Sequence, residues 1–181
     1  MFDAVRAVLL ASDTVGWVST ASAVYRTRDM GKTWTEVRPP GWSATATSRF
    51  VDADTMYVAS QYVGSDGGPV AIAATHDGGT SWVEATIDGP PRMAGMVLSF
   101  RTPDSGTATF FTADGKDLRV FETADGGRTW TGPVRSSAPR MLYLLKDLDL
   151  YRSGDRALVL SNALAPGTPF DNNVYLSMDG G

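Results

Sequence analysis

Residues 75–82 read Thr75-His76-Asp77-Gly78-Gly79-Thr80-Ser81-Trp82, and the pattern Ser/Thr-x-Asp-x-Gly-x-Thr/Ser-Trp recurs along the chain. Two more complete copies span residues 27–34 and 123–130, and a partial copy spans residues 177–181. The first residues of successive copies are 48, 48 and 54 positions apart. A fixed period of this length is typical of solenoids, propellers and other repeat arrays. The repeat therefore constrains the fold more strongly than it constrains the function.

Each residue type in this motif suits a tight turn between two strands. The aspartate carboxylate can accept hydrogen bonds from the amides just ahead of it. The glycine two positions later tolerates a positive φ, and the tryptophan offers a large apolar face to the next sheet. Because a turn fastener is needed in every repeat and a catalytic acid only once, we interpret the repeated residues as structural. They are Asp29, Gly31, Trp34, Asp77, Gly79, Trp82, Asp125, Gly127, Trp130, Asp179 and Gly181.

The segments between the motifs read as short β-strands. Runs of Val, Thr, Tyr, Phe and Ala alternate with turns rich in Gly, Asp, Ser and Pro, and only the Leu-rich residues 141–151 leave a helix open. Four strands per repeat predict an all-β propeller of four-stranded antiparallel blades, with about 3.75 blades present as a partial ring. We expect a single, incomplete propeller domain over residues 1–181. Its blades would span residues 1–40, 41–88, 89–136 and 137–181.

Composition argues against several classes of function. The 181 residues carry a net charge of −4 without a basic stripe, so we expect no nucleic-acid partner. No apolar run reaches the roughly 18 residues of a membrane span, and no signal peptide is visible at Met1. The lack of cysteine excludes disulfides and thiolate chemistry. We expect neither a cofactor nor a metal site, although the turns at residues 66–68 and 171–173 offer oxygen ligands of the kind that Ca²⁺ takes.

The turn motif resembles the Asp-box, also called the bacterial neuraminidase repeat. Families with this repeat include sialidases, sortilin-type receptors, certain xyloglucan hydrolases and propeller-type photosystem II assembly factors. Gly16-Trp17 matches a second signature of the sortilin-like and assembly-factor-like repeats, whereas the third repeat has Gly106-Thr107 there. The resemblance implies a propeller and makes an extracellular or periplasmic location plausible. It implies little about activity, because one propeller fold hosts unrelated functions.

In the resembling families the face opposite the motif turns carries binding and catalysis. The loops expected on that face are those at residues 63–69, 114–117 and 163–173. Arg92 and Arg140 both stand in the triplet Pro-Arg-Met, ten residues after a motif tryptophan. We interpret these two arginines as candidate anion-binding residues, because a guanidinium group can hold a carboxylate with two hydrogen bonds. The alternative is that they pair with nearby carboxylates as part of the repeat.

We therefore predict a non-catalytic scaffold that binds a protein or carbohydrate ligand on the loop face. A fragment of a sialidase-like glycoside hydrolase is the alternative, but the sialidase-type arginine signature near the first blade is absent. A xyloglucan hydrolase would need two channel-lining aspartates. The candidates are Asp52, Asp104, Asp147 and Asp149, of which Asp52 and Asp104 read as first-turn residues on the motif face. We expect His76 to face solvent, and we expect an open ring end to favour self-association.

Overall fold

The chain folds into four successive antiparallel β-sheets, each a simple meander in which neighbouring strands follow one another in sequence. The structure is a computed structural model, and it describes residues 4–42, 46–60, 68–91, 93–112, 118–136, 145–153, 156–163 and 172–177. The first sheet consists of β1 (Val5–Leu10), β2 (Gly16–Thr20), β3 (Val24–Thr27) and β4 (Thr35–Glu36). The described residues include no helix long and apolar enough to cross a membrane.

The second and third sheets repeat the order of the first. The second consists of β5 (Thr47–Phe50), β6 (Met56–Ser60), β7 (Pro69–Thr75) and β8 (Val83–Asp88). The third consists of β9 (Met93–Phe100), β10 (Gly106–Thr112), β11 (Leu118–Thr123) and β12 (Thr131–Ser136). The fourth sheet has three described strands, β13 (Leu145–Ser153), β14 (Arg156–Ala163) and β15 (Asn172–Ser177). Residues 145–151 are therefore strand, and the helix alternative for this Leu-rich run is wrong there.

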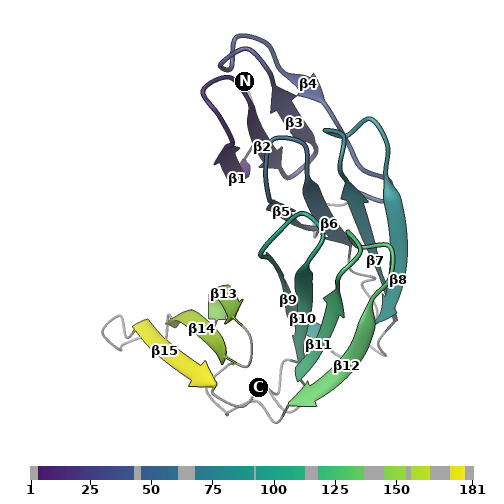
Figure 1. Cartoon of the computed structure of the whole chain (residues 1–181), viewed down its shortest axis with the longest axis vertical. Helices are drawn as coiled ribbons and strands as arrows, with labels where there is room; N and C mark the ends of the chain where they lie inside the picture. Colours follow the sequence, from purple (N-terminus) through teal and green to yellow (C-terminus); the bar gives the residue numbers. More distant parts are fainter. Residues whose placement is uncertain are drawn as a thin grey trace.

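The four sheets lie side by side along an arc, as blades lie in a propeller (Figure 1). The first strand of each sheet lies toward the inside of the arc, and in the first three sheets the fourth strand lies toward the outside (Figure 1). The inner strand β5 contacts both β1 and β9, and β13 contacts β9. This arrangement confirms the prediction of an all-β propeller with four-stranded antiparallel blades in a partial ring.

The hydrophobic core lies between the sheets, because a single four-stranded sheet cannot bury both of its faces. One cluster joins the first and second sheets, with Trp17 and Val24 on one side and Phe50 and Met56 on the other. The other cluster joins the second and third sheets. Its members are Tyr57, Ala59, Val70, Ile72, Ala74, Ile87, Leu98, Ala108, Phe110 and Phe121. Each interface is thus built from two adjacent repeats.

Candidate functional site

The motif turns between the third and fourth strands share one hydrogen-bond pattern. In the second sheet, the Asp77 carboxylate accepts bonds from the Ser81 N–H (2.9 Å) and the Ser81 hydroxyl (2.6 Å). The Thr75 hydroxyl donates to the same carboxylate at 2.8 Å and accepts from the Gly79 N–H at 2.8 Å. The same four bonds recur in the first and third sheets, with lengths that differ by no more than 0.2 Å.

These bonds hold the motif carboxylates in the ionised form. The hydroxyl of Thr33, and then its backbone N–H, lower the pKa of Asp29 from 3.8 to about 2. Thr129 lowers the pKa of Asp125 to about 2 in the same way, and Ser81 lowers the pKa of Asp77. A carboxylate that is ionised near neutral pH and accepts several hydrogen bonds from its own turn stabilises that turn. It is not suited to deliver a proton as a general acid.

The motif tryptophans pack toward the preceding sheet. Trp82 lies against the cluster between the first and second sheets, and Trp130 lies against the cluster between the second and third. The expectation that each tryptophan faces the next sheet is wrong for Trp82 and Trp130, which lie against the sheet before them. Trp34, in the first sheet, donates from its ring N–H to the Gly31 carbonyl at 3.1 Å.

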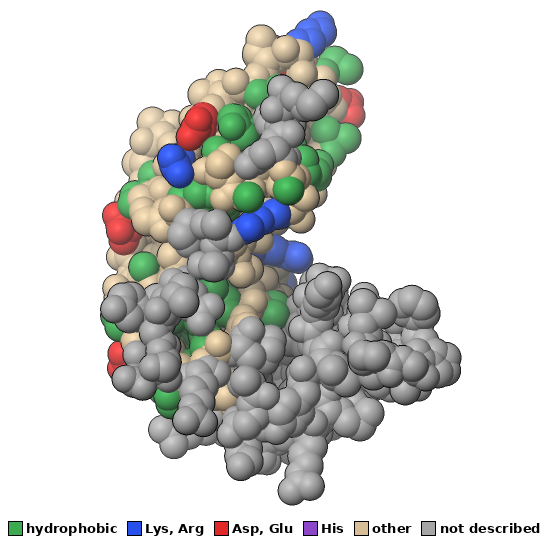
Figure 2. Space-filling view, turned by 180° about the vertical axis from the view of Figure 1, so that it is seen from behind, with side chains coloured by type: hydrophobic (Ala, Val, Ile, Leu, Met, Phe, Trp, Pro, Cys, Tyr) green, Lys and Arg blue, Asp and Glu red, His purple; other side chains and the backbone are tan. Residues whose placement is uncertain are grey.

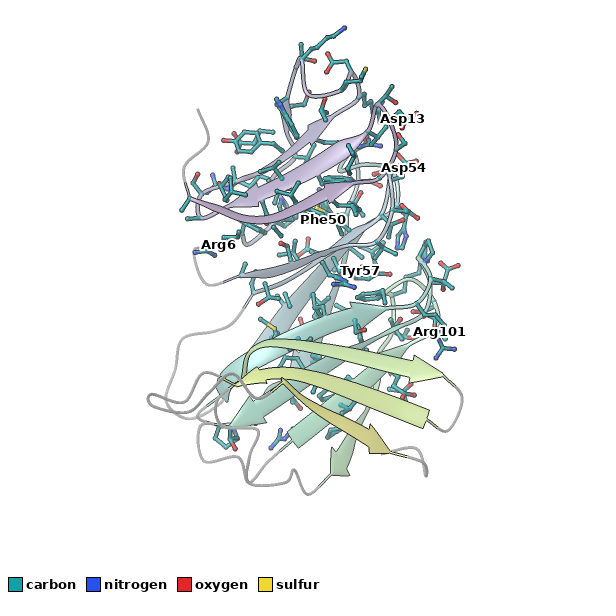
Figure 3. All side chains as sticks on the ribbon, turned by 90° about the vertical axis from the view of Figure 1, so that its left-hand side faces the viewer. Arg6, Asp13, Phe50, Asp54, Tyr57 and Arg101 are labelled. Carbon is teal, nitrogen blue, oxygen red and sulfur yellow. The ribbon has the colours of Figure 1, made fainter. Side chains whose placement is uncertain are left out.

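The first turns of the sheets lie on the same face as the motif turns. The backbone N–H groups of Met30, Gly78 and Gly126 donate to carbonyls in the first turn of their own sheets. Figure 3 shows Asp13, Asp54 and Arg101, one from the first turn of each of the first three sheets, along the same side of the stack. The acceptors are the carbonyls of Thr14, Asp54 and Asp104. This agrees with the interpretation of Asp52 and Asp104 as residues of the motif face.

Aromatic side chains on the second strands fasten the first sheet to the second and the second sheet to the third. The Trp17 ring N–H donates to the Asp52 carbonyl at 3.0 Å, and the Tyr57 hydroxyl donates to the Pro103 carbonyl at 2.6 Å. Burial, followed by the negative charge of Asp104, raises the pKa of Tyr57, so its hydroxyl stays a donor. Asp52 also caps its own turn, because its carboxylate accepts from the backbone N–H groups of Asp54 (2.9 Å) and Thr55 (2.7 Å).

Arg26 and His76 add a second link between the sheets. The Arg26 guanidinium is 94% buried, lies 5.1 Å from the Trp17 ring centre and donates to the Asp54 carboxylate and to the Ala53 carbonyl. It also donates to the Gly78 carbonyl at 3.4 Å. One interface further on, His76 Nε2 lies 2.9 Å from the equivalent carbonyl, that of Gly126. The expectation that His76 faces solvent is therefore wrong, because the next sheet covers it.

A polar cleft of about 490 Å³ opens between the first and second sheets on this side of the molecule. Arg28 lies on its wall, is exposed, and forms no ion pair with any described residue. The wall combines the motif turns of both sheets with the short strand β4. Its other residues include Thr33, Thr35, Glu36, Val37 and Thr80. Sequence reasoning missed this cleft, although Arg28 stands where the other motifs have His76 and Ala124.

Several residues singled out in the sequence lie outside the described ranges. They are Arg92, Arg140, Asp179 and Gly181, together with most of the loops at residues 63–69, 114–117 and 163–173. Asp147 and Asp149 lie on β13, the strand of the fourth sheet that contacts β9. The described part of the candidate site is therefore the motif face and its cleft. The loop face stays a prediction.

No protein-family model and no curated protein matches the chain. Among solved structures, an ancestral GH74 enzyme is similar with a TM-score of 0.51 and 15% identity, over 95% of this chain and 24% of the enzyme. A structure of YCF48 bound to a D1 peptide has a TM-score of 0.49 and 21% identity, over 92% of this chain and 51% of that one. The chain thus spans about half or less of the length of either structure. The likeness to the GH74 enzyme supports the propeller fold alone.

Proposed function

We propose that this chain is a non-catalytic propeller scaffold that binds a protein ligand, and that the cleft between the first and second sheets holds part of that ligand. The observation that carries the proposal is the lining of this cleft of about 490 Å³. It combines the exposed guanidinium of Arg28, which forms no ion pair with a described residue, with threonine hydroxyls and the apolar side chain of Val37. An exposed guanidinium group is suited to hold a carboxylate of the ligand with two hydrogen bonds.

The same lining supports binding over hydrolysis. Glycoside hydrolysis ordinarily uses two carboxyl groups that flank the scissile bond. Among the described residues that line the cleft, the only carboxylate is that of Glu36. The nearby carboxylates of Asp29 and Asp77 are occupied by the hydrogen bonds of their own turns. The carboxylates of Asp29 and Asp77 therefore stabilise their turns, and the side chains that line the cleft are suited to bind a ligand.

We propose in addition that the turn motif is an Asp-box, as its repeated hydrogen bonds support. Arg92 and Arg140 would then supply a second, anion-binding contact on the loop face. A carbohydrate is the other ligand class that the resemblance implies. Binding of a carbohydrate in place of a peptide is an outcome of the test below.

The test is an array of short peptides of varied charge, probed beside a glycan array with the fluorescently labelled chain. We expect the bound peptides to be enriched in Asp and Glu, and their affinity to fall roughly tenfold in Arg28→Glu, about 1.4 kcal/mol. The control is Arg38→Glu, which reverses an exposed charge outside the cleft wall. Binding of glycans alone, or equal losses in both variants, would overturn the assignment of the cleft. Turnover of a fluorogenic sialoside would overturn the non-catalytic role.

A further inference from the structure

Within the described part of the chain, the outer edge of β4 has no partner strand. Strand β4 is the last strand of the first sheet, and it lies at the outside of the arc (Figure 1). It pairs with β3 through Thr35 and Glu36, and the N–H of Val37 donates to the Val24 carbonyl at 2.9 Å. In an antiparallel pair, successive residues direct their backbone groups alternately toward the partner strand and away from it. The N–H and the carbonyl of Glu36 therefore point away from β3, toward the free edge.

The polar cleft between the first and second sheets follows this edge. Residues 35–37 all line it, and the motif turn of the second sheet lines it at residues 78–80. Side chains of successive strand residues point to opposite faces of a sheet. A cleft that touches three successive residues of one strand therefore runs along the edge of that strand and is not confined to one face. A Cβ added at Gly79 would lie 2.6 Å from the Val37 Cβ, so the motif turn of the second sheet approaches β4 closely.

Arg28, on the wall of the cleft, is released from the docking role that its position has in the next repeat. His76 occupies the same motif position in the second sheet, and its Nε2 lies 2.9 Å from the Gly126 carbonyl. In the first sheet the equivalent carbonyl, that of Gly78, accepts a hydrogen bond from Arg26 instead, at 3.4 Å. The exposed guanidinium of Arg28 can therefore hold a carboxylate of a ligand in the cleft.

We propose that the protein ligand binds in this cleft as an added β-strand, which pairs with the outer edge of β4 and directs an acidic side chain to Arg28. The inference rests on the proposed function and specifies the form of its ligand. In strand addition, main-chain hydrogen bonds supply affinity and alternate side chains supply specificity. Here the N–H and the carbonyl of Glu36 supply the main-chain bonds, and Arg28 supplies the preference for an acidic residue.

The surroundings of β4 limit the added strand further. Pro39 and Pro40 follow soon after the strand and have no backbone N–H to donate, so the segment that pairs with this edge is short. Basic and hydrophobic side chains lie together at the upper end of the molecule, which the first sheet forms (Figure 2). A short, extended segment that combines acidic and apolar residues matches this surface.

Backbone methylation of the ligand tests the strand pairing. The probe is the acidic peptide that binds most tightly on the array described above, labelled for fluorescence anisotropy titrations. Its analogues carry a single N-methyl group at successive residues, which removes one N–H and leaves every side chain unchanged. We expect the affinity to fall about tenfold at alternate residues, whose N–H groups face β4, and less than about twofold at the residues between them. Equal losses at successive residues, or no loss at any residue, would overturn strand addition.

Glu36→Pro removes the matching N–H from the protein. This N–H faces away from β3, so its loss leaves the bonds between β3 and β4 in place, and proline is tolerated on an edge strand. We expect the affinity for the peptide to fall about tenfold. Glu84→Pro is the matched control, because Glu84 pairs with Ala73 on β7 as Glu36 pairs with Tyr25, and it does not line the cleft. Circular dichroism verifies that both variants are folded, and equal losses of affinity would overturn the role of the β4 edge.

The outcomes distinguish this inference from the proposed function. If the affinity of the peptide depends on Arg28 but does not alternate along the methylated series, strand addition fails and the proposed function stands. If the chain binds no peptide, both fail. A chain that dimerises through this edge, with a dimer that Glu36→Pro dissociates, would show that a second copy occupies the edge, and this result would overturn the assignment to a protein ligand.

Discussion

Replacement of Gly127 by alanine tests how closely the second and third sheets approach. Gly127 has a φ of +82°, and a Cβ there would lie 2.8 Å from Tyr57 Cε1 and 3.4 Å from the Ala74 Cβ. The Tyr57 ring cannot withdraw, because it is fully buried, stacks on Phe100 and is fixed by its hydroxyl at Pro103. The left-handed backbone costs an alanine about 1–2 kcal/mol, and overpacking adds about 1–3 kcal/mol. Alanine also makes the unfolded chain less flexible than glycine does, which offsets about 0.4–1 kcal/mol of the lost unfolding free energy.

The matched control is Gly31→Ala. Gly31 has nearly the same φ, +80°, but the nearest atom to its Cβ would be in its own Trp34 ring, at 3.6 Å. Backbone strain is thus common to both variants, and overlap between sheets is present only at Gly127. We expect urea titrations to show a loss of unfolding free energy about 1–3 kcal/mol larger for Gly127→Ala. Equal losses in the two variants would refute the argument that close approach of the sheets requires this glycine.

Three further predictions concern single turns and bonds. Met30→Gly should stabilise the chain by up to about 1 kcal/mol in urea titrations, because Met30 is exposed and has a φ of 63° where the other motifs have glycine. Asp125→Asn should weaken the dependence of the unfolding free energy on pH in the acid range. Because the pKa of Asp125 is lowered from 3.8 to about 2, its carboxylate contributes stability that is present above about pH 4 and is lost as the pH falls toward 2. An unchanged slope of unfolding free energy against pH would contradict this prediction. Tyr57→Phe should cost about 0.5–1.5 kcal/mol in thermal or urea unfolding, because it leaves the Pro103 carbonyl without its donor; no measurable change would show that water replaces the hydroxyl.

The fold could be predicted from the sequence because its strongest signals are local. The motif around Asp77 places an aspartate, a glycine and a hydroxyl residue within five positions, and the described hydrogen bonds to the Asp77 carboxylate all come from within the motif. The hydrogen bonds within this turn join residues two to four positions apart. The Leu-rich run at residues 141–151 was ambiguous for the opposite reason. Its hydrophobic pattern fits a buried strand and a helix equally well.

Contacts between sheets could not be predicted in the same way. Arg26 reaches Asp54 and Gly78, and His76 reaches Gly126, across 28 to 52 positions of sequence. Whether such side chains meet depends on how far one sheet is shifted and rotated against the next, which no local pattern encodes. The cleft beside Arg28 is a product of the same placement. A useful signal was nevertheless present, since Arg26 is a cation where the second repeat has Ala74.

The hydrogen-bond acceptors between the sheets have a consequence for how such a chain evolves. The carbonyls of Asp52, Pro103 and Gly126 receive side chains of the preceding sheet, and a carbonyl is supplied by any residue. A mutation in the receiving turn therefore leaves the acceptor in place. Duplicated repeats can drift apart in sequence while still docking on one another. Selection then acts mainly on the donor side chains and on the few glycines that let the sheets come close.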